Sequence, residues 1–236
     1  MREIIAAGLA QMELTGRVPP AAPDQLAEYG RLLLEKNQVM NLTAITEPTD
    51  VAQLHLLDCA AVLTLADLKY KTVVDVGTGA GFPGMPLQIL EPTAKLTLLD
   101  SLNKRIGFLQ EVCDALGLKH THCVHARAEE YARNHREQFD FATSRAVAAL
   151  NILCELALPM VKVGGAFLAM KSVDSDEELR QAKSAIAQLG GSVESVRDYI
   201  IPGTEIRHRL ITIRKIKPSP ASFPRTFARI KKNPLI

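Results

Sequence analysis

The stretch Thr72–Phe108, TVVDVGTGAGFPGMPLQILEPTAKLTLLDSLNKRIGF, decides how the rest of the chain is interpreted. Its pattern predicts a strand, a glycine-rich turn, a helix, a second strand that ends in an acid, and a second helix. Glycines let the backbone approach a ligand without interference from a Cβ atom, and the start of the next helix offers free N–H groups. The carboxylate of Asp100 can accept hydrogen bonds from a ribose diol. The stretch therefore predicts a nucleoside cofactor.

The strand and helix patterns continue to alternate after this stretch, which predicts a largely parallel sheet with helices on both faces. The last two strand patterns flank Pro202-Gly203-Thr204, a turn signal that predicts an antiparallel hairpin. The expected fold class is α/β, a Rossmann-like, mostly parallel seven-stranded sheet closed by this hairpin. We expect three parts: residues 1–70 as a helical extension packed on the core, residues 71–216 as the cofactor-binding core, and residues 217–236 as a basic tail.

The composition is ordinary for a soluble globular protein. Of the 236 residues, 47% are apolar and 23% are charged, and no run approaches the ~20 apolar residues that a membrane-spanning helix needs. Glu3 and Glu13 lie where a signal peptide has an uncharged run. The four cysteines form no Cys-x-x-Cys pair, which predicts core thiols rather than a zinc site or disulfides. We expect a cytoplasmic protein without a membrane segment or a bound metal.

Positive charge is concentrated at the C-terminal end. Residues 207–236 contain nine arginines and lysines and no acid; because the whole chain carries +2, the first 206 residues carry −7. A basic end on an acidic body indicates a polyanionic partner. Phe223 and Phe227 lie among the basic residues, where their rings can stack on nucleobases. We expect this end to contact nucleic acid; the alternative is a solvated tail.

The glycine loop is compatible with two kinds of nucleoside ligand. The run from Gly79 to Gly84 fits the G-x-G-x-x-G pattern, so a dinucleotide-dependent oxidoreductase is an alternative. However, Pro83 removes an N–H from the turn, and Asp75 just before it should repel a diphosphate and attract an ammonium and a sulfonium. A P-loop is excluded, because Met85-Pro86 follow where Lys and Ser or Thr are required. These features favour S-adenosyl-L-methionine.

At finer grain, the sequence resembles the ribosomal RNA small-subunit methyltransferase G family, also called GidB, over nearly the whole chain. The resemblance rests on Asn41-Leu42-Thr43, His55-Leu56-Leu57-Asp58, DVGTGAGFPG from Asp75, LLDSLNKRIGFL from Leu98, Arg127-Ala128-Glu129-Glu130, Ser144-Arg145-Ala146 and the ending FPR…KKNPL. The chain departs from the family at Leu54, where a basic residue is common, and at Cys59, where serine is frequent. The resemblance implies a methyltransferase that uses S-adenosyl-L-methionine and modifies N7 of a guanine in small-subunit ribosomal RNA.

The strand ends and the resemblance together predict the site residues. The expected cofactor contacts are Asp75, Gly77, Gly79, Phe82, Asp100, Ala128, Glu129 and Arg145. The expected RNA contacts are Asn41, Arg145, Lys171, Arg225, Lys231 and Lys232. Four of these residues have other possible roles: Phe82 as a core aromatic, Glu129 as a helix-start acid, Arg145 as an ion-pair partner of Asp75, Asp140 or Glu129, and Lys171 as a side chain that reaches solvent along its own stem.

The implied reaction needs no general base, because N7 of guanine carries a lone pair and no proton. Catalysis then consists of positioning, and we assign no catalytic base. The chain also lacks an N/D-P-P-Y/F tetrapeptide and a Pro-Cys or Thr-Cys nucleophile. The expected partner is small-subunit ribosomal RNA or the small ribosomal subunit, and the expected state is a monomer. The alternative is a non-catalytic RNA-binding or cofactor-sensing protein on the same fold.

Overall fold

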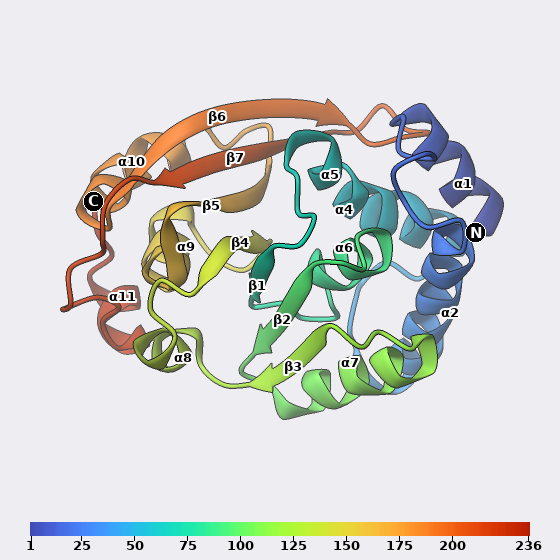
Figure 1. Ribbon diagram of the computed structural model, residues 1–236, viewed down its shortest axis with the longest axis horizontal. Helices are drawn as coiled ribbons and strands as arrows, with labels where there is room; N and C mark the ends of the chain where they lie inside the picture. Colours follow the sequence, from blue (N-terminus) through green and yellow to red (C-terminus); the bar gives the residue numbers. More distant parts are fainter.

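A computed structural model describes residues 1–236 as a seven-stranded sheet with helices on both faces (Figure 1). The strand order is β3-β2-β1-β4-β5-β7-β6, in which β1 to β5 run parallel and β7 runs antiparallel to both of its neighbours. The α/β fold class and the closing hairpin are confirmed. The strands are β1 Thr72–Val76, β2 Lys95–Asp100, β3 Thr121–His125, β4 Phe139–Arg145, β5 Val161–Ser172, β6 Gly191–Ile200 and β7 Arg207–Lys215.

The helices form two layers, one on each face of the sheet (Figure 1). One layer contains α1 Arg2–Gln11, α2 Ala22–Met40, α3 Pro48–Asp50, η1 Val51–Leu57, α4 Asp58–Ala60, α5 Val62–Leu65, α6 Gly84–Leu90 and α7 Asn103–Leu116. The other contains α8 Ala128–Asn134, α9 Leu150–Ala157, η2 Leu158–Met160, α10 Asp176–Gln188 and α11 Phe227–Lys232. Each layer has its own hydrophobic cluster against the sheet. No helix is both long enough and apolar enough to cross a membrane.

The N-terminal helices pack directly on the α/β core. Ile5 of α1 and Leu26 and Leu33 of α2 are fully buried, in the same cluster as Leu98 of β2 and Leu109 of α7. Helix α2 lies against both α6 and α7. Burial of these side chains, worth about 1.5–3 kcal/mol each, is the main force that holds this helical layer on the sheet.

The helical segment that begins at Pro48 is broken into short pieces. Residues Val51–Leu57 form a wider π-helical turn, in which the N–H of Asp58 donates to the carbonyl of Gln53. Regular spacing of apolar residues predicts a continuous α-helix, because the pattern does not encode the extra residue of a π turn. The π turn directs the carbonyl of Leu54, the ring of His55 and the carboxylate of Asp58 toward the end of β4.

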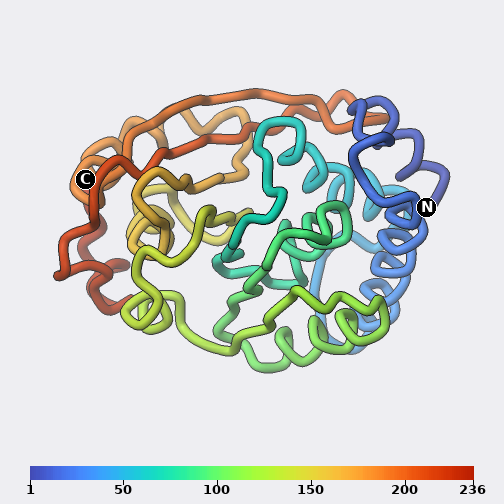
Figure 2. The backbone as a smooth tube through the Cα atoms, in the orientation of Figure 1, coloured from blue at the N-terminus to red at the C-terminus, as the bar shows by residue number.

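The segment predicted to be a basic tail is folded against α9. Ile230 is fully buried in the same cluster as Leu153. The buried carboxylate of Glu155 accepts hydrogen bonds from the backbone N–H and the guanidinium of Arg225 at 2.6–2.9 Å. Figure 2 shows the C-terminal segment running beside this helical layer, on the side of the molecule opposite the N-terminus. Charge alone did not reveal this packing, because the few apolar residues of the segment are widely spaced.

Candidate active site

A cavity of about 500 Å³ lies where the parallel strands β1 to β4 end. The carboxyl ends of parallel strands meet at one edge of a sheet, which is where α/β folds bind ligands. We call this space the cofactor cavity. Of the eight residues predicted to contact a cofactor, seven line it: Gly77, Gly79, Phe82, Asp100, Ala128, Glu129 and Arg145.

The glycine loop is held against the end of β2. The N–H groups of Gly77 and Thr78 both donate to the carbonyl of Leu99, at 2.9 and 3.0 Å. Gly77 has φ +70° and Gly79 has φ +61°, so both need the left-handed conformation that glycine adopts without strain. The N–H of Gly79 donates to Asp100 Oδ2 at 2.9 Å. The loop and the acid at the end of β2 therefore form one rigid unit.

Asp75 is the one predicted cofactor contact that lies outside the cavity lining. The residue is fully buried, and its carboxylate accepts hydrogen bonds from Thr78 Oγ1, Gly84 N and Thr143 Oγ1 at 2.6–3.1 Å. Burial raises the pKa of Asp75 to about 6 although these hydrogen bonds act in the opposite direction. Asp75 therefore holds the glycine loop in place from the side away from the cavity. Because its carboxylate does not line the cavity, its charge does not indicate which ligand binds there.

Two carboxylates face the cavity with capacity to accept further hydrogen bonds. Asp100 is 5% exposed and accepts from Gly79, from Leu102 N at 2.8 Å and from Arg105 at 3.4 Å, which leaves lone pairs unused. Glu129 is 6% exposed, lines the cavity and has no hydrogen-bond partner within the chain. Since its carboxylate opens onto the cavity with no donor from the chain, this acid is placed to accept a hydrogen bond from a ligand.

Arg145, at the end of β4, connects the cavity to the N-terminal layer. Its Nη1 donates to the carbonyl of Leu54 at 3.1 Å and to Asp58 Oδ2 at 2.9 Å, and its Nη2 donates to His55 Nδ1 at 2.9 Å. The guanidinium lies 4.6 Å from the centre of the Phe82 ring. The ion pair was predicted with Asp75, Asp140 or Glu129, but the partner is Asp58, which comes from the N-terminal helices. Nε–H and one Nη2–H remain free for a ligand.

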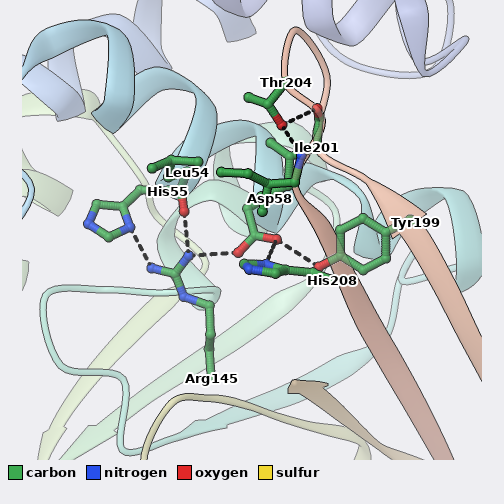
Figure 3. A network of polar contacts seen from close by, with 9 residues as sticks. Leu54, His55, Asp58, Arg145, Tyr199, Ile201, Thr204 and His208 are labelled. Carbon is green, nitrogen blue, oxygen red and sulfur yellow. Dashed lines mark hydrogen bonds and ion pairs between the residues drawn. The ribbon is translucent and has the colours of Figure 1, made fainter. Parts of the chain in front are cut away.

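Asp58 is the centre of a buried network that also includes Arg145, Tyr199 and His208 (Figure 3). Its Oδ1 accepts from the Tyr199 hydroxyl at 2.7 Å and from His208 Nδ1 at 2.8 Å. Burial alone would raise the pKa of Asp58, but the hydrogen bond from His208 and the charge of Arg145 outweigh it, so the pKa is lowered. The same hydrogen bond raises the pKa of His208 against the effect of burial. We call these four residues the Asp58 network.

His55 is held as a neutral ring. Burial and the nearby charge of Arg145 lower its pKa to about 4. Because arginine can only donate, Nδ1 is the acceptor, and the Nε2–H group points to Thr43 Oγ1 at 2.8 Å. The ring stacks on Phe82 with 4.4 Å between centres. Neither nitrogen of His55 is therefore free to act as a base.

Comparison with known proteins identifies the family. The family model described as rRNA small subunit methyltransferase G (GidB) matches residues 23–207.

The chain belongs to this family. Among curated relatives, the ribosomal RNA small subunit methyltransferase G of Clostridium perfringens is 48% identical over 210 residues, 88% of each chain. The corresponding protein of Alkaliphilus oremlandii is 44% identical over 238 residues, covering 100% of this chain and 99% of that one.

Solved structures support the methyltransferase fold. TrmN from Thermus thermophilus has a TM-score of 0.52 at 23% identity and covers 66% of this chain and 48% of its own. A precorrin-6y C5,15-methyltransferase from Geobacter metallireducens has a TM-score of 0.52 at 16% identity and covers 75% of this chain and 92% of its own. These likenesses show the fold that this GidB family member shares with other methyltransferases.

The residues predicted to contact RNA are scattered over the structure of this family member. Asn41 is exposed at the end of α2, next to Leu42 and Thr43 in the cavity lining. Two predicted contacts already have an acidic partner within the chain, Lys171 with Glu178 at 2.6 Å and Arg225 with Glu155, and their contact with RNA stays a prediction. Of the remaining three, Arg145 lines the cofactor cavity, whereas Lys231 and Lys232 are exposed on α11.

Several site residues of this family member were not predicted. Asp58, Tyr199 and His208 were missed because Asp58 meets Arg145, and Tyr199 and His208 meet Asp58, from segments that are remote in sequence. Asp58 did carry a signal, since it ends the family motif that begins at His55. Phe227 lines the cofactor cavity from the C-terminal segment, where the sequence predicted only a contact with nucleic acid.

Proposed function

We propose that this protein transfers a methyl group from S-adenosyl-L-methionine to N7 of a guanine in small-subunit ribosomal RNA. The observation that carries the proposal is the pair of nearly buried acids, Asp100 and Glu129, that face the cavity beside the glycine loop. Membership in the rRNA small subunit methyltransferase G family supplies the substrate class and, through the resemblance described above, the N7 position. The small ribosomal subunit is a further candidate partner, and we propose a monomer as the active form.

The residues around the cavity fit an adenosine-containing cofactor. Asp100 has lone pairs for the ribose hydroxyls, and Glu129 has a carboxylate that no group of the chain satisfies. Val76 and Leu99 offer apolar surface for a purine. The free N–H groups of Arg145 can hold a carboxylate, since an arginine fork matches that geometry. When bound, the cofactor supplies an electrophilic methyl group on a cationic sulfur.

The remaining task of the protein is to orient the acceptor base. N7 of guanine needs no deprotonation, and orientation can lower a barrier by several kcal/mol, up to ~7–11 for well-aligned groups. The histidine in the cavity fits this requirement, because both nitrogens of His55 are already engaged. Phe82 and His55 present a stacked pair at the cavity edge that a nucleobase can approach. We therefore expect no substitution to behave as the loss of a general base.

Incubation with methyl-labelled cofactor and undermethylated small ribosomal subunits tests the proposal directly. We expect label in the ribosomal RNA, at a guanine that becomes sensitive to cleavage at N7-methylated positions. If neither the RNA of small ribosomal subunits nor naked transcripts of it became labelled, the enzymatic assignment would be overturned. That result would favour a non-catalytic RNA-binding or cofactor-sensing protein.

Calorimetry distinguishes the cofactor from a dinucleotide. We expect binding of S-adenosylhomocysteine and no binding of NAD(H). The reverse result would point to an oxidoreductase on a related fold.

A further inference from the structure

A second cavity, of about 360 Å³, lies between α8 and the C-terminal segment. Four of its nine lining residues are arginines and none is an acid. We call it the arginine pocket. The lining residues are Arg133, Arg136, Ala221, Ser222, Phe223, Pro224, Arg225, Thr226 and Arg229.

Three of the four guanidinium charges have no acidic partner. Arg225 is neutralised by Glu155. Arg136 is fixed by hydrogen bonds to the carbonyls of Phe223, Ser219 and Pro220, which hold the side chain in place but leave its charge uncompensated. Arg133 and Arg229 are exposed and form no ion pair.

Uncompensated like charges around one hollow repel each other and destabilise the fold by a small amount. A cluster of this kind becomes favourable when a polyanion neutralises it, and guanidinium groups match phosphate oxygens in charge and in planar geometry. The exposed hydroxyls of Ser222 and Thr226 add donors at the same place. The pocket therefore has the chemistry of a phosphate-binding site.

The arginine pocket and the cofactor cavity are lined by consecutive residues of the chain. Thr226 lines the arginine pocket, and the next residue, Phe227, lines the cofactor cavity. The guanidinium of Arg127, which also lines the cofactor cavity, lies 5.7 Å from the centre of the Phe227 ring. A nucleic-acid strand that places one base at the cofactor cavity can thus have a backbone phosphate over this pocket.

We propose that the arginine pocket binds a backbone phosphate of the RNA substrate close to the base that is methylated. This inference rests on the proposed function. It assigns the electrostatic contact to Arg133, Arg136 and Arg229, whereas Arg225 keeps the C-terminal segment in place.

The test uses the full-length Arg133→Ala/Arg229→Ala variant. Both side chains are exposed and unpaired, so the thermal stability and the affinity for S-adenosylhomocysteine should stay at wild-type values. We expect the dissociation constant for small-subunit ribosomal RNA to rise roughly tenfold, and the slope of log K against log salt to fall by about 0.7–0.9 for the one lost phosphate contact.

The matched control is Arg17→Ala/Arg197→Ala, which removes two exposed arginines that also have no ion pair and do not line the pocket. The proposal is overturned when the two double variants bind RNA with the same affinity and salt slope. Wild-type protein that neither binds nor methylates the RNA would instead overturn the proposed function, so the two failures are distinguishable.

A titration with inorganic phosphate identifies the source of the phosphate group. Phosphate that competes with RNA for the wild type but not for the Arg133→Ala/Arg229→Ala variant supports the proposal. Phosphate binding that this variant loses while its RNA affinity is unchanged would assign the pocket to a free anion and overturn the RNA assignment.

Discussion

Two clusters with arginine side chains adjoin the cofactor cavity, and they differ in what surrounds the arginine charges. In the Asp58 network, the charge of Arg145 is paired with a fully buried carboxylate and the guanidinium is 14% exposed. In the arginine pocket, only Arg225 has an acid, while Arg136 is held by carbonyls and Arg133 and Arg229 face solvent. Paired arginines stabilise and orient the fold, and unpaired ones remain available to a polyanion. The difference therefore separates structural arginines from candidate RNA contacts, which net charge along the sequence does not do.

Removal of the acid at the centre of the Asp58 network should have the largest effect. In Asp58→Ala, Arg145 remains inside with no counter-charge, and the free energy of unfolding should fall by about 3–5 kcal/mol. Urea denaturation measures this change. The control is Asp176→Ala, which removes an 84% exposed acid from Arg209, a residue that keeps Asp198, and should cost less than about 1 kcal/mol. Similar losses in both variants would contradict the structural role of the network.

The paired arginine of the pocket gives a second test. In Glu155→Ala, the three hydrogen bonds to Arg225 are lost, and stability should fall by about 2 kcal/mol because the exposed end of this arginine can turn to water. RNA affinity should be maintained, since the pocket keeps all of its positive charge. Denaturation combined with filter binding gives both values. If Glu155→Ala lost RNA affinity and kept full stability, the paired Arg225 would be an RNA contact and not a structural arginine.

Glu129, an acid without a partner in the chain, allows the same comparison of paired and unpaired charges for cofactor binding. In Glu129→Gln no contact within the chain is lost, so stability should not fall, whereas the affinity for S-adenosylhomocysteine should drop about 10- to 100-fold, equivalent to about 1.5–3 kcal/mol. Calorimetry provides the affinity. Glu130→Gln is the control, because it changes the adjacent exposed acid on α8 and should bind like the wild type. Equal affinities in the two variants would remove Glu129 from the site.

The smallest effect concerns pH. The pKa of His208 is raised in the folded state by Asp58, so its charge adds stability below the unfolded value of 6.5, and this contribution is lost as pH rises through the folded value. The pKa of Asp58 is lowered, so its own contribution is lost only in acid, below 3.8. Denaturation of wild type and His208→Gln should therefore differ more at about pH 5.5 than at about pH 8.5. A pH-independent difference would show that the ring acts by packing alone.

The sequence predicted the parts of the fold that local patterns encode. The glycine loop, the acid at Asp100 and the hairpin around Gly203 follow from turn chemistry and strand periodicity, and all lie where predicted. The π turn before Asp58 was missed because apolar spacing does not show which carbonyl accepts each hydrogen bond. The inward orientation of Asp75 could not be predicted, because an acid at a strand end can face inward or outward, and only the packing of Thr78 and Thr143 decides this.

The Asp58 network also has a consequence for the order of folding. The hydrogen bonds of Asp58 to Arg145, Tyr199 and His208 join residues 87, 141 and 150 positions apart. Closing such long loops costs chain entropy before the contacts repay it, so these bonds form after the strands have assembled. Substitutions at Asp58 should then accelerate unfolding and leave the folding rate nearly unchanged. On this argument the ion pair that fixes Arg145 at the cofactor cavity forms late in folding, together with the other contacts of Asp58.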